Sequence, residues 1–411
     1  MRELTAISLF TGAGGLDFGF EAAGFRTAVA LEIDERCCST LRHNRPWPVI
    51  DRDIGSVPTD ELLRTAGLEV GQADVLIGGP PCQPFSKSGF WATGDAKRLD
   101  DPRATTLEGY LRVLAEARPR AFLLENVEGL GFSGKDEGLQ LIHARLASIN
   151  ETHGTRYQAT IATLNAADYG VPQLRKRIFV VGSRDGTTFN FPAATHVAPA
   201  EADWTDNRPR HLTAWDALHD LEEPNDPSVI LTGKWADLLP TIPEGKNYLW
   251  HTDRSGGEPL FGWRRRFWSF LLKLAKDQPA WTIQAQPGPA TGPFHWNNRR
   301  LTMREMARLQ TFPDGIEIPG SIADAQRQLG NAVPSLLAEV LARAIAWQLL
   351  GRSAWPTPVK LAIQPSRSPP PAPAVPRPVP KKFLNLRGDH AAHPGTGKGA
   401  RASVRGLVAA D

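Results

Sequence analysis

The chain has 411 residues, and 41% of them are hydrophobic, which is enough for a catalytic domain with a sizeable core and a smaller second domain. Three cysteines are too few for a disulfide framework, and the ten histidines lack the spacing of metal ligands, so we expect no metal site. No secretory signal precedes the first motif, and no apolar run approaches the roughly 18 residues of a membrane helix. We therefore expect a cytoplasmic protein with no membrane partner.

The net charge of +3 is unevenly divided. Residues 352–411 contain ten basic and two acidic side chains, a net charge of +8, whereas the preceding residues contain 37 basic and 42 acidic ones, a net charge of −5. Residues 351–411 are also rich in proline and poor in large apolar side chains, so we expect a disordered tail. Composition favours a solvated extension over a dedicated nucleic-acid arm, and such a tail adds only non-specific attraction to DNA.

The first elements are typical of a nucleotide-binding α/β domain. Residues 6–10 read as a strand, residues 11–15 as a glycine-rich turn, and residues 16–24 as a short helix. A second strand, over residues 27–31, ends in Glu32, and an acid at this distance suits a ribose diol. Asp53 suits an adenine amino group. The alternative is that the glycines serve an ordinary turn and that both acids are solvated loop charges.

Cys82 follows a predicted strand over residues 74–77 that two glycines and two prolines end abruptly. A cysteine taken alone is more often a small buried hydrophobe than a nucleophile. The stiff loop favours the nucleophile, because double proline holds a reacting atom still at the carboxyl end of a strand, where open α/β sheets place their sites.

Two further strand ends carry charged side chains. A predicted strand over residues 121–127 contains Glu125, and Arg175 and Arg177 precede another over residues 178–182. In an extended chain these two arginines point to the same side. A thiol, an acid and a guanidinium pair can attack, protonate and hold one heterocycle.

The segment over residues 185–290 breaks this strand–helix rhythm, and prolines, tryptophans and basic residues interleave in it. Its densest basic patch lies within residues 262–268 and suits a DNA groove. The alternative is an amphipathic helix with Trp263, Phe267 and Leu271 in a core. Beyond this segment, residues 301–311 predict a helix with a capping box of Thr302 and Glu305, and residues 334–350 predict an amphipathic helix.

In this order, the motifs resemble those of the cytosine-C5-specific DNA methyltransferases of bacterial restriction-modification systems. The resemblance covers about residues 3–350 and rests on residues 10–15, 32, 53, 80–83, 125–127, 173–177, 300–313 and 330–334. It implies an α/β fold of the S-adenosylmethionine-dependent, Rossmann-like type, with a mixed sheet, helices on both faces and a smaller irregular target-recognition domain.

The resemblance also implies how the chain is divided. Residues 1–184 form the catalytic and cofactor-binding domain, residues 185–319 the target-recognition region and return segment, residues 320–350 the segment that completes the catalytic domain, and residues 351–411 the tail. The last predicted helix is expected beside the glycine loop.

The implied activity is methyl transfer from S-adenosylmethionine to C5 of a flipped-out cytosine in a specific short sequence of double-stranded DNA. Cys82 forms a covalent bond to C6, Glu125 bonds N3 and the exocyclic amine, and Arg177 with Arg175 holds O2. The cofactor-binding residues expected from the family are Phe10, Gly12, Gly14, Gly15, Leu16, Glu32, Ile33, Asp53, Ile54, Pro80, Asn331 and Val333. The expected DNA-binding residues are Gln83, Ser86, Ser88, Gln173, Arg264, Arg265 and Arg266.

We expect a monomer that associates with the nucleoid through DNA, and a cognate restriction endonuclease, where one exists, to act separately. The main alternative is C5 methylation of cytosine in RNA of the transfer RNA type, which shares every catalytic residue. A glycine-loop oxidoreductase explains Gly12 to Gly15 but not Cys82 together with Glu125. A non-catalytic DNA-binding regulator requires a damaged site, which the sequence does not have.

Overall fold

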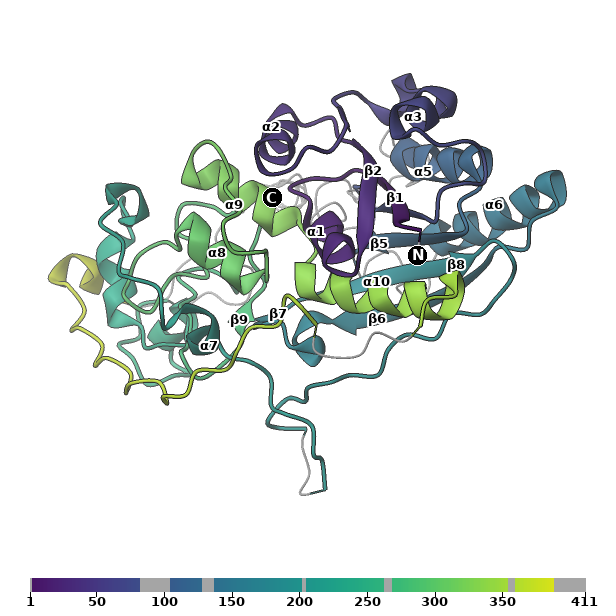
Figure 1. The fold of residues 1–411 in the computed structure, drawn as a ribbon. Coiled ribbons are helices and arrows are strands. Elements are labelled where there is room, and N and C mark those ends of the chain that lie inside the picture. Colours follow the sequence, from purple (N-terminus) through teal and green to yellow (C-terminus); the bar gives the residue numbers. More distant parts are fainter. Residues whose placement is uncertain are drawn as a thin grey trace, which may run out of the picture.

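In this computed structural model, the structure describes residues 2–81, 104–127, 137–201, 205–261, 268–353 and 359–387. Its main element is a seven-stranded sheet in the order β3-β2-β1-β4-β5-β8-β6, in which β8 runs antiparallel to both of its neighbours (Figure 1). The central strands are buried and almost continuously apolar, as in sheets covered on both faces. The strands are β1 (Leu4–Leu9), β2 (Phe25–Leu31), β3 (Val49–Ile50), β4 (Val75–Gly78), β5 (Ala121–Asn126), β6 (Gln158–Asn165) and β8 (Lys176–Ser183).

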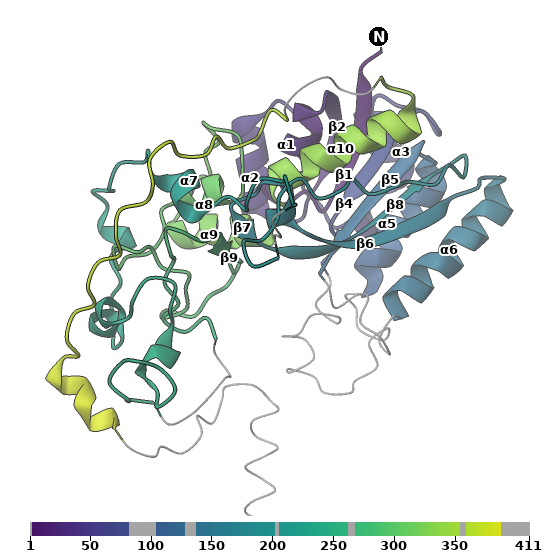
Figure 2. The same cartoon turned by 90° about the horizontal axis from the view of Figure 1, so that it is seen from below.

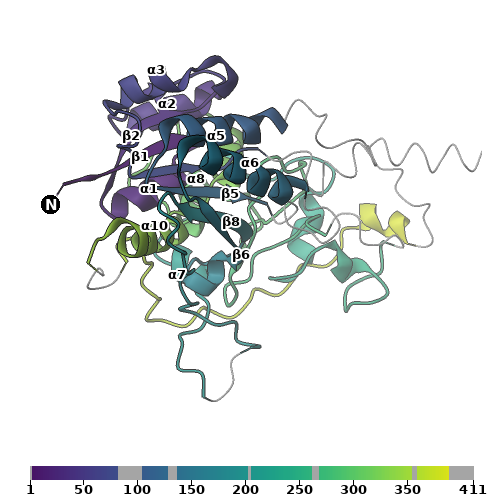
Figure 3. The ribbon, with the colours of Figure 1, turned by 90° about the vertical axis from the view of Figure 1, so that its right-hand side faces the viewer.

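Helices cover both faces of this sheet, which confirms the expected fold class (Figure 3). On one face lie α3 (Thr59–Ala66), α5 (Ala104–Ala117) and α6 (Glu137–His153). On the other face lie α1 (Gly15–Ala22) and α10 (Ser335–Leu350). The last two pack closely at Gly19, where an added Cβ would lie 2.4 Å from the Cβ of Ala338. The predicted helices at both ends of the domain are thus present, and they lie side by side.

A third apolar cluster joins the seven-stranded sheet and its helices to the rest of the molecule. Phe18 of α1 packs with residues of α7 (Ala214–Leu218), α8 (Met303–Leu309) and α9 (Ile322–Asn331). The capping box predicted for α8 is confirmed, because the Thr302 hydroxyl accepts from the Glu305 N–H while the Glu305 carboxylate accepts from the Thr302 N–H. Strand β2 leads into α2 (Glu35–Asn44), and the Asp34 side chain caps the N-terminus of α2. Asp34 also forms an ion pair with Arg327 of α9.

The second part of the molecule is irregular, as expected. Around a core of residues such as Leu239, Tyr248 and Phe261, it has the short 3₁₀ helices η4 (Pro227–Val229), η5 (Ala236–Thr241) and η6 (Tyr248–His251). A small two-stranded sheet of β7 (Gln173–Leu174) and β9 (Ala280–Trp281) links it to the part that contains the seven-stranded sheet. Residues 268–271 are not helical, so the amphipathic-helix alternative does not hold there.

Within the described part of the chain, one helical stretch, Ile322–Leu350, is long and apolar enough to span a membrane by length and composition. However, 72% of its most apolar window is buried inside the fold, which is the property of a core helix.

The expectation of a disordered tail is wrong for residues 359–387, which we call the strap. The strap begins beside Glu339 of α10, runs along the molecule and ends in η7 (Lys381–Leu386), where Phe383 is only 3% exposed (yellow in Figures 1 and 2). Its apolar side chains are too few to form a core, but they insert into clusters that other segments have already built. Because proline restricts the unfolded chain, the strap loses less conformational entropy when it becomes ordered. A small number of contacts is therefore enough to hold it on the rest of the molecule.

Candidate active site

The expected site segments meet at the carboxyl ends of β1, β4 and β5, which are neighbours in the sheet. The glycine loop follows β1, Pro80 and Pro81 follow β4, and Glu125 lies in the last part of β5. The strand order reverses at β1, and the crevice at such a switch point is where open α/β sheets bind ligands.

Glu125 and Arg177 form an ion pair with 3.0 Å between Oε1 and Nε. The register pairs Glu125 with Phe179 on antiparallel β8, so Arg177, two residues away, lies on the same face. Glu125 is 8% exposed, and burial raises the pKa of its carboxyl, while the nearby Arg177 and Arg175 oppose that shift. A buried carboxyl with a raised pKa, steered by a guanidinium, can deliver a proton to a bound ring.

The glycines after β4 are needed for close approach. A Cβ at Gly79 would lie 2.8 Å from Oε2 of Glu125, and a Cβ at Gly78 would lie 2.7 Å from the carbonyl oxygen of Leu9. The sequence alone predicts only that these glycines end the strand. In the structure they also let the loop that leads to Cys82 pass directly beside the Glu125 carboxylate.

Cys82 itself lies outside the described residues, which end at Pro81 and resume at residue 104. The other two cysteines of the chain, Cys37 and Cys38, are both buried. Burial raises the pKa of Cys38 to about 11 and also raises that of Cys37. Because the thiolate is the nucleophilic form, neither suits covalent catalysis, and Cys82 stays the candidate nucleophile. Gln83, Ser86, Ser88, Arg264, Arg265 and Arg266 also lie outside the described residues.

Arg175 and Gln173 are both fully buried, which differs from the roles expected for them. Arg175 Nη2 donates to the Gly330 carbonyl at 2.8 Å, and Gln173 Nε2 donates to the Leu309 carbonyl at 3.3 Å. Residue 175 falls between β7 and β8, so the alternation argument that aligned the two arginines does not apply. Gln173 thus lies buried against the protein's own backbone, and Arg175 hydrogen-bonds to the Gly330 and Ile283 carbonyls while its charge favours the ionised form of Glu125.

The glycine loop and Glu32 fit a nucleoside-containing cofactor. Gly12 has a left-handed φ of +57° with open space around its Cα, and its N–H donates to Glu32 Oε2 at 2.7 Å. Glu32 Oε1 accepts from the N–H groups of Ile33 and Asp34, and burial raises the pKa of the Glu32 carboxyl. Ile33 is 62% exposed. A fixed carboxylate beside an exposed apolar side chain and an open loop suits a ribose and an adenine ring.

The remaining expected cofactor residues lie around this loop. Asp53 is exposed and caps the 3₁₀ turn η1 (Ile54–Ser56), and Asn331 is exposed at the end of α9. A Cβ at Gly15 would lie 2.3 Å from the Val333 carbonyl, so the last motif packs against the glycine loop as expected. Of the other members of the set, Phe10 is half-buried with a left-handed φ of 53°. Buried members are Gly14, Leu16, Ile54 and Pro80.

Sequence reasoning missed the role of Asn126. Its side-chain amide donates to the Pro80 carbonyl at 3.2 Å, and its side-chain oxygen accepts from the Val127 N–H. This side chain joins the end of β5 to the loop before Cys82. The sequence signal for this role is the place of Asn126 directly after Glu125 in the Glu-Asn-Val motif.

A family model described as C-5 cytosine-specific DNA methylase matches residues 4–347. The chain is 42% identical over 373 residues to the type II methyltransferase M.SacI of Streptomyces achromogenes, covering 85% of this chain and 94% of that protein. It is 34% identical over 358 residues to M1.HphI of Haemophilus parahaemolyticus, covering 84% and 87%.

Solved structures show the same fold. A DNA modification methyltransferase encoded within an E. coli prophage is similar with a TM-score of 0.59 and 24% identity, covering 85% of this chain and 100% of that one. The Entamoeba histolytica methyltransferase EhMeth is similar with a TM-score of 0.59 and 16% identity, covering 85% and 99%.

Proposed function

The chain belongs to the C-5 cytosine-specific DNA methylase family and is a DNA (cytosine-5-)-methyltransferase, and on this basis we propose how its residues perform the reaction. The enzyme acts on a flipped-out cytosine in a short specific sequence of double-stranded DNA. The observation that carries this assignment is the Glu125–Arg177 pair, which lies against Gly79 in the loop that leads to Cys82.

Cys82 provides the nucleophile that activates the ring. C5 of cytosine is too weakly nucleophilic to accept a methyl group unaided. Addition of the Cys82 thiolate to C6 makes C4–C5 an enamine, so that C5 becomes nucleophilic enough to accept the methyl group that S-adenosylmethionine would supply, with the cofactor's thioether as the leaving group. Loss of the C5 proton and departure of the Cys82 sulfur restore the aromatic ring.

Glu125 and Arg177 stabilise the negative charge that develops on the cytosine ring. As the thiolate adds, electron density moves toward N3, and Glu125 protonates N3 while accepting from the exocyclic amine. The burial that raises the pKa of Glu125 favours the protonated form that this step needs. Arg177 fixes the carboxyl from one side and holds O2 of the ring. Arg175 acts through the loops that it supports.

S-adenosylmethionine supplies an electrophilic methyl group when bound. We propose that Gly12 and Gly14 provide its backbone cradle, that Glu32 binds the ribose diol, and that Ile33 packs on the adenine. Asn331 and Val333 close the site from the other side of the glycine loop.

The reaction requires base flipping, because C6 is inaccessible in a stacked duplex and extrusion costs a few kcal/mol. We assign chemistry to residues 1–184 and 320–350 and sequence recognition to residues 185–290. We further propose that the protein acts as a monomer in the bacterial cytoplasm, and that any cognate restriction endonuclease is a separate protein.

A 5-fluorocytosine duplex tests the assignment. Fluorine at C5 cannot leave as a proton, so with S-adenosylmethionine present the wild-type enzyme is expected to remain covalently bound to C6. Cys82→Ser should form no adduct, whereas Cys38→Ser, a control at a buried cysteine, should form it normally. An adduct that persists in Cys82→Ser would falsify the nucleophile. Labelled methyl transfer to transfer RNA but not to duplex DNA would favour the RNA alternative.

A further inference from the structure

The strap, residues 359–387, contacts three separate apolar clusters in succession. Val359 and Leu361 pack against the cluster of the catalytic sheet and α10. Ile363 packs against the cluster that joins α1 to α7, α8 and α9. Phe383 is part of the core of the irregular region, against which Val379, Leu384 and Leu386 also pack. One short segment thus bridges the catalytic sheet and the target-recognition region.

The catalytic end of the strap has a specific polar anchor. Glu339 of α10 is fully buried, and its carboxylate accepts from the backbone N–H groups of Lys360 at 2.7 Å and Leu361 at 2.8 Å. Arg343, one turn further along α10, pairs with the same carboxylate. If the start of the strap moved away, the buried Glu339 carboxylate would lose two hydrogen bonds, which costs free energy of folding. These hydrogen bonds therefore fix the start of the strap.

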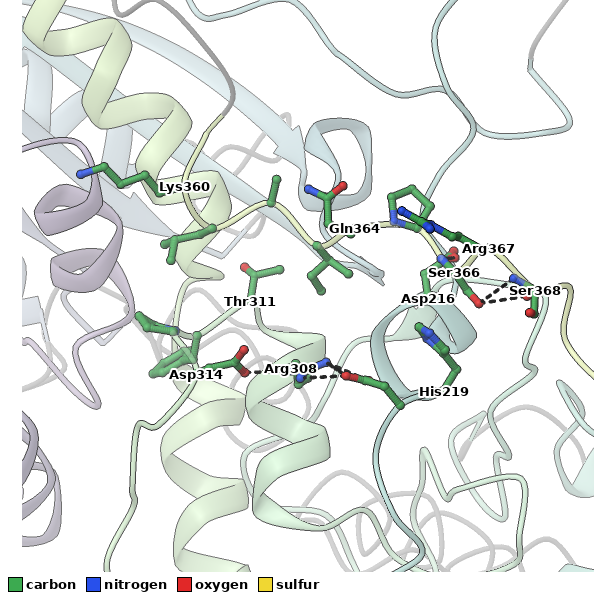
Figure 4. A pocket seen from close by; sticks show the side chains of 17 residues that line it. Asp216, His219, Arg308, Thr311, Asp314, Lys360, Gln364, Ser366, Arg367 and Ser368 are labelled. Atoms are coloured by element: carbon green, nitrogen blue, oxygen red, sulfur yellow. Dashed lines mark hydrogen bonds and ion pairs between the residues drawn. The ribbon is translucent and has the colours of Figure 1, made fainter.

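The middle of the strap crosses α7 and α8. Asp216 accepts from the Ser366 N–H at 2.8 Å, and Trp215 Nε1 donates to the Ser368 carbonyl at 3.1 Å. A cavity of about 560 Å³ lies between the strap and these helices (Figure 4). In its lining Arg308 pairs with Asp220 and Asp314, and Glu125 is not among its lining residues. The cavity is therefore a space that the strap spans and not the reaction site.

The far end of the strap is bound to the target-recognition region. Phe383 stacks on Trp235 with ring centroids 6.0 Å apart and an interplanar angle of 10°. The Arg377 N–H donates to the Pro240 carbonyl at 3.0 Å. Two cations of the strap are neutralised here, because Lys382 pairs with Asp237 and Arg387 pairs with Glu258 at 2.7 Å. These cations are held in fixed geometry and are not free for non-specific attraction.

The stretch between the anchors is stiff. Residues 369–380 contain seven prolines in twelve positions: Pro369, Pro370, Pro371, Pro373, Pro376, Pro378 and Pro380. Such a sequence favours an extended polyproline conformation of about 3.1 Å per residue, which acts as a semi-rigid spacer. A stiff segment fixed at both ends holds those ends at a set distance.

We propose that the strap is a brace that sets the distance between the catalytic sheet and the target-recognition region, and thereby positions that region on duplex DNA. This inference rests on the proposed function. It replaces the expectation that the whole tail contributes only non-specific attraction. Because a preorganised arrangement avoids the cost of ordering two parts during binding, the brace acts on affinity for DNA and not on the methyl-transfer chemistry.

Two truncations separate the strap from the segment beyond it. A chain that ends at residue 387 should keep the KM for target duplex, whereas a chain that ends at residue 353 should raise it by about tenfold or more, equivalent to roughly 1.4 kcal/mol. The KM for S-adenosylmethionine and the fraction of enzyme that forms the 5-fluorocytosine adduct at saturating duplex should stay within about twofold. A parallel fall in that fraction would mean a purely structural role and would overturn the proposal.

Substitutions within the strap test the brace if the truncated chain fails to fold. Phe383→Ala should raise the KM for duplex and Phe383→Tyr should restore it, whereas Val375→Ala, at a 90% exposed strap position, should have no effect. Replacing the seven prolines by serine at equal length should raise the same KM while both anchors persist. An unchanged KM in the Phe383→Ala and proline variants contradicts the brace.

Amide hydrogen exchange tests the brace independently of catalysis. Exchange in residues 236–251 should accelerate in Phe383→Ala and stay unchanged in Val375→Ala. If the full chain transfers no methyl group to DNA, the proposed function fails, and this measurement still decides whether the strap holds the target-recognition region in place. Equal exchange in both variants would contradict the brace.

Discussion

The Glu125 carboxyl is subject to two opposing effects, since burial raises its pKa and the guanidinium at 3.0 Å favours its charged form. Glu125→Gln keeps the shape and removes the acid. Methyl transfer to duplex DNA should fall by about two to four orders of magnitude, the usual contribution of general acid catalysis. S-adenosylmethionine affinity, measured by calorimetry, should barely change. A collapse of that affinity would make Glu125 a cofactor or structural residue.

Gly79→Ala tests the close approach to the same carboxyl. The new Cβ would lie 2.8 Å from Glu125 Oε2, the mobile end of a side chain, so the carboxyl should shift while the backbone stays in place. We expect kcat to fall by about tenfold or more, because a misplacement of about 1 Å can cost a hundredfold. The thermal unfolding midpoint should change little. Full activity in this variant would show that Glu125 does not act from its observed position.

At the scale of elements, strands and helices were predictable where the local signals agreed. The apolar runs that end in glycine, proline or an acid predict the bounds of β1, β2, β4 and β5 to within a few residues. The Thr302–Glu305 capping box predicts where α8 begins. The exact role of Arg175 was not predictable. Its burial depends on Gly330, 155 residues away, and no local pattern encodes a contact at that separation.

A buried carboxyl joins three of these elements. Asp17 of α1 accepts from the Ser8 hydroxyl of β1 and the Thr27 hydroxyl of β2, and burial raises its pKa from 3.8 to about 6. Below pH 3.8 both the folded and unfolded states bind the proton. Between pH 3.8 and 6 the unfolded state releases it first, so this group's contribution to stability is lost as pH rises.

Asp17→Asn tests this dependence. From pH 4 to 6.5, the free energy of unfolding of the variant relative to wild type should rise by up to about 3 kcal/mol, because the variant lacks the titration. Urea denaturation across this range measures the difference. Val375→Ala, at a 90% exposed position and without a titratable group, is the control and should show no comparable trend. Parallel pH profiles for Asp17→Asn and wild type would contradict the assignment.

At the scale of the whole molecule, composition alone was misleading about the strap. Its proline content and lack of large apolar residues indicate that it cannot build its own core, and that conclusion still holds. What the sequence does not show is that other segments provide the missing surface, such as Trp235 for Phe383, almost 150 residues later in the chain. By contrast, the order of motifs around the site was readable, because each lies at the end of its own strand.

The division of the molecule can be tested by exchange of its parts. Replacing residues 185–290 with the matching segment of a related enzyme should give a new methylated sequence while adduct formation through Cys82 is retained. The exchanged segment also contains Trp235, Asp237 and Glu258, which hold the strap, so the chimera should show a raised KM for its new target. Mapping methylated cytosines on plasmid DNA identifies the target, and Cys82→Ser in the chimera is the control. A chimera that keeps the old target would show that bases are read outside residues 185–290, since phosphate contacts position a protein on DNA but do not specify sequence.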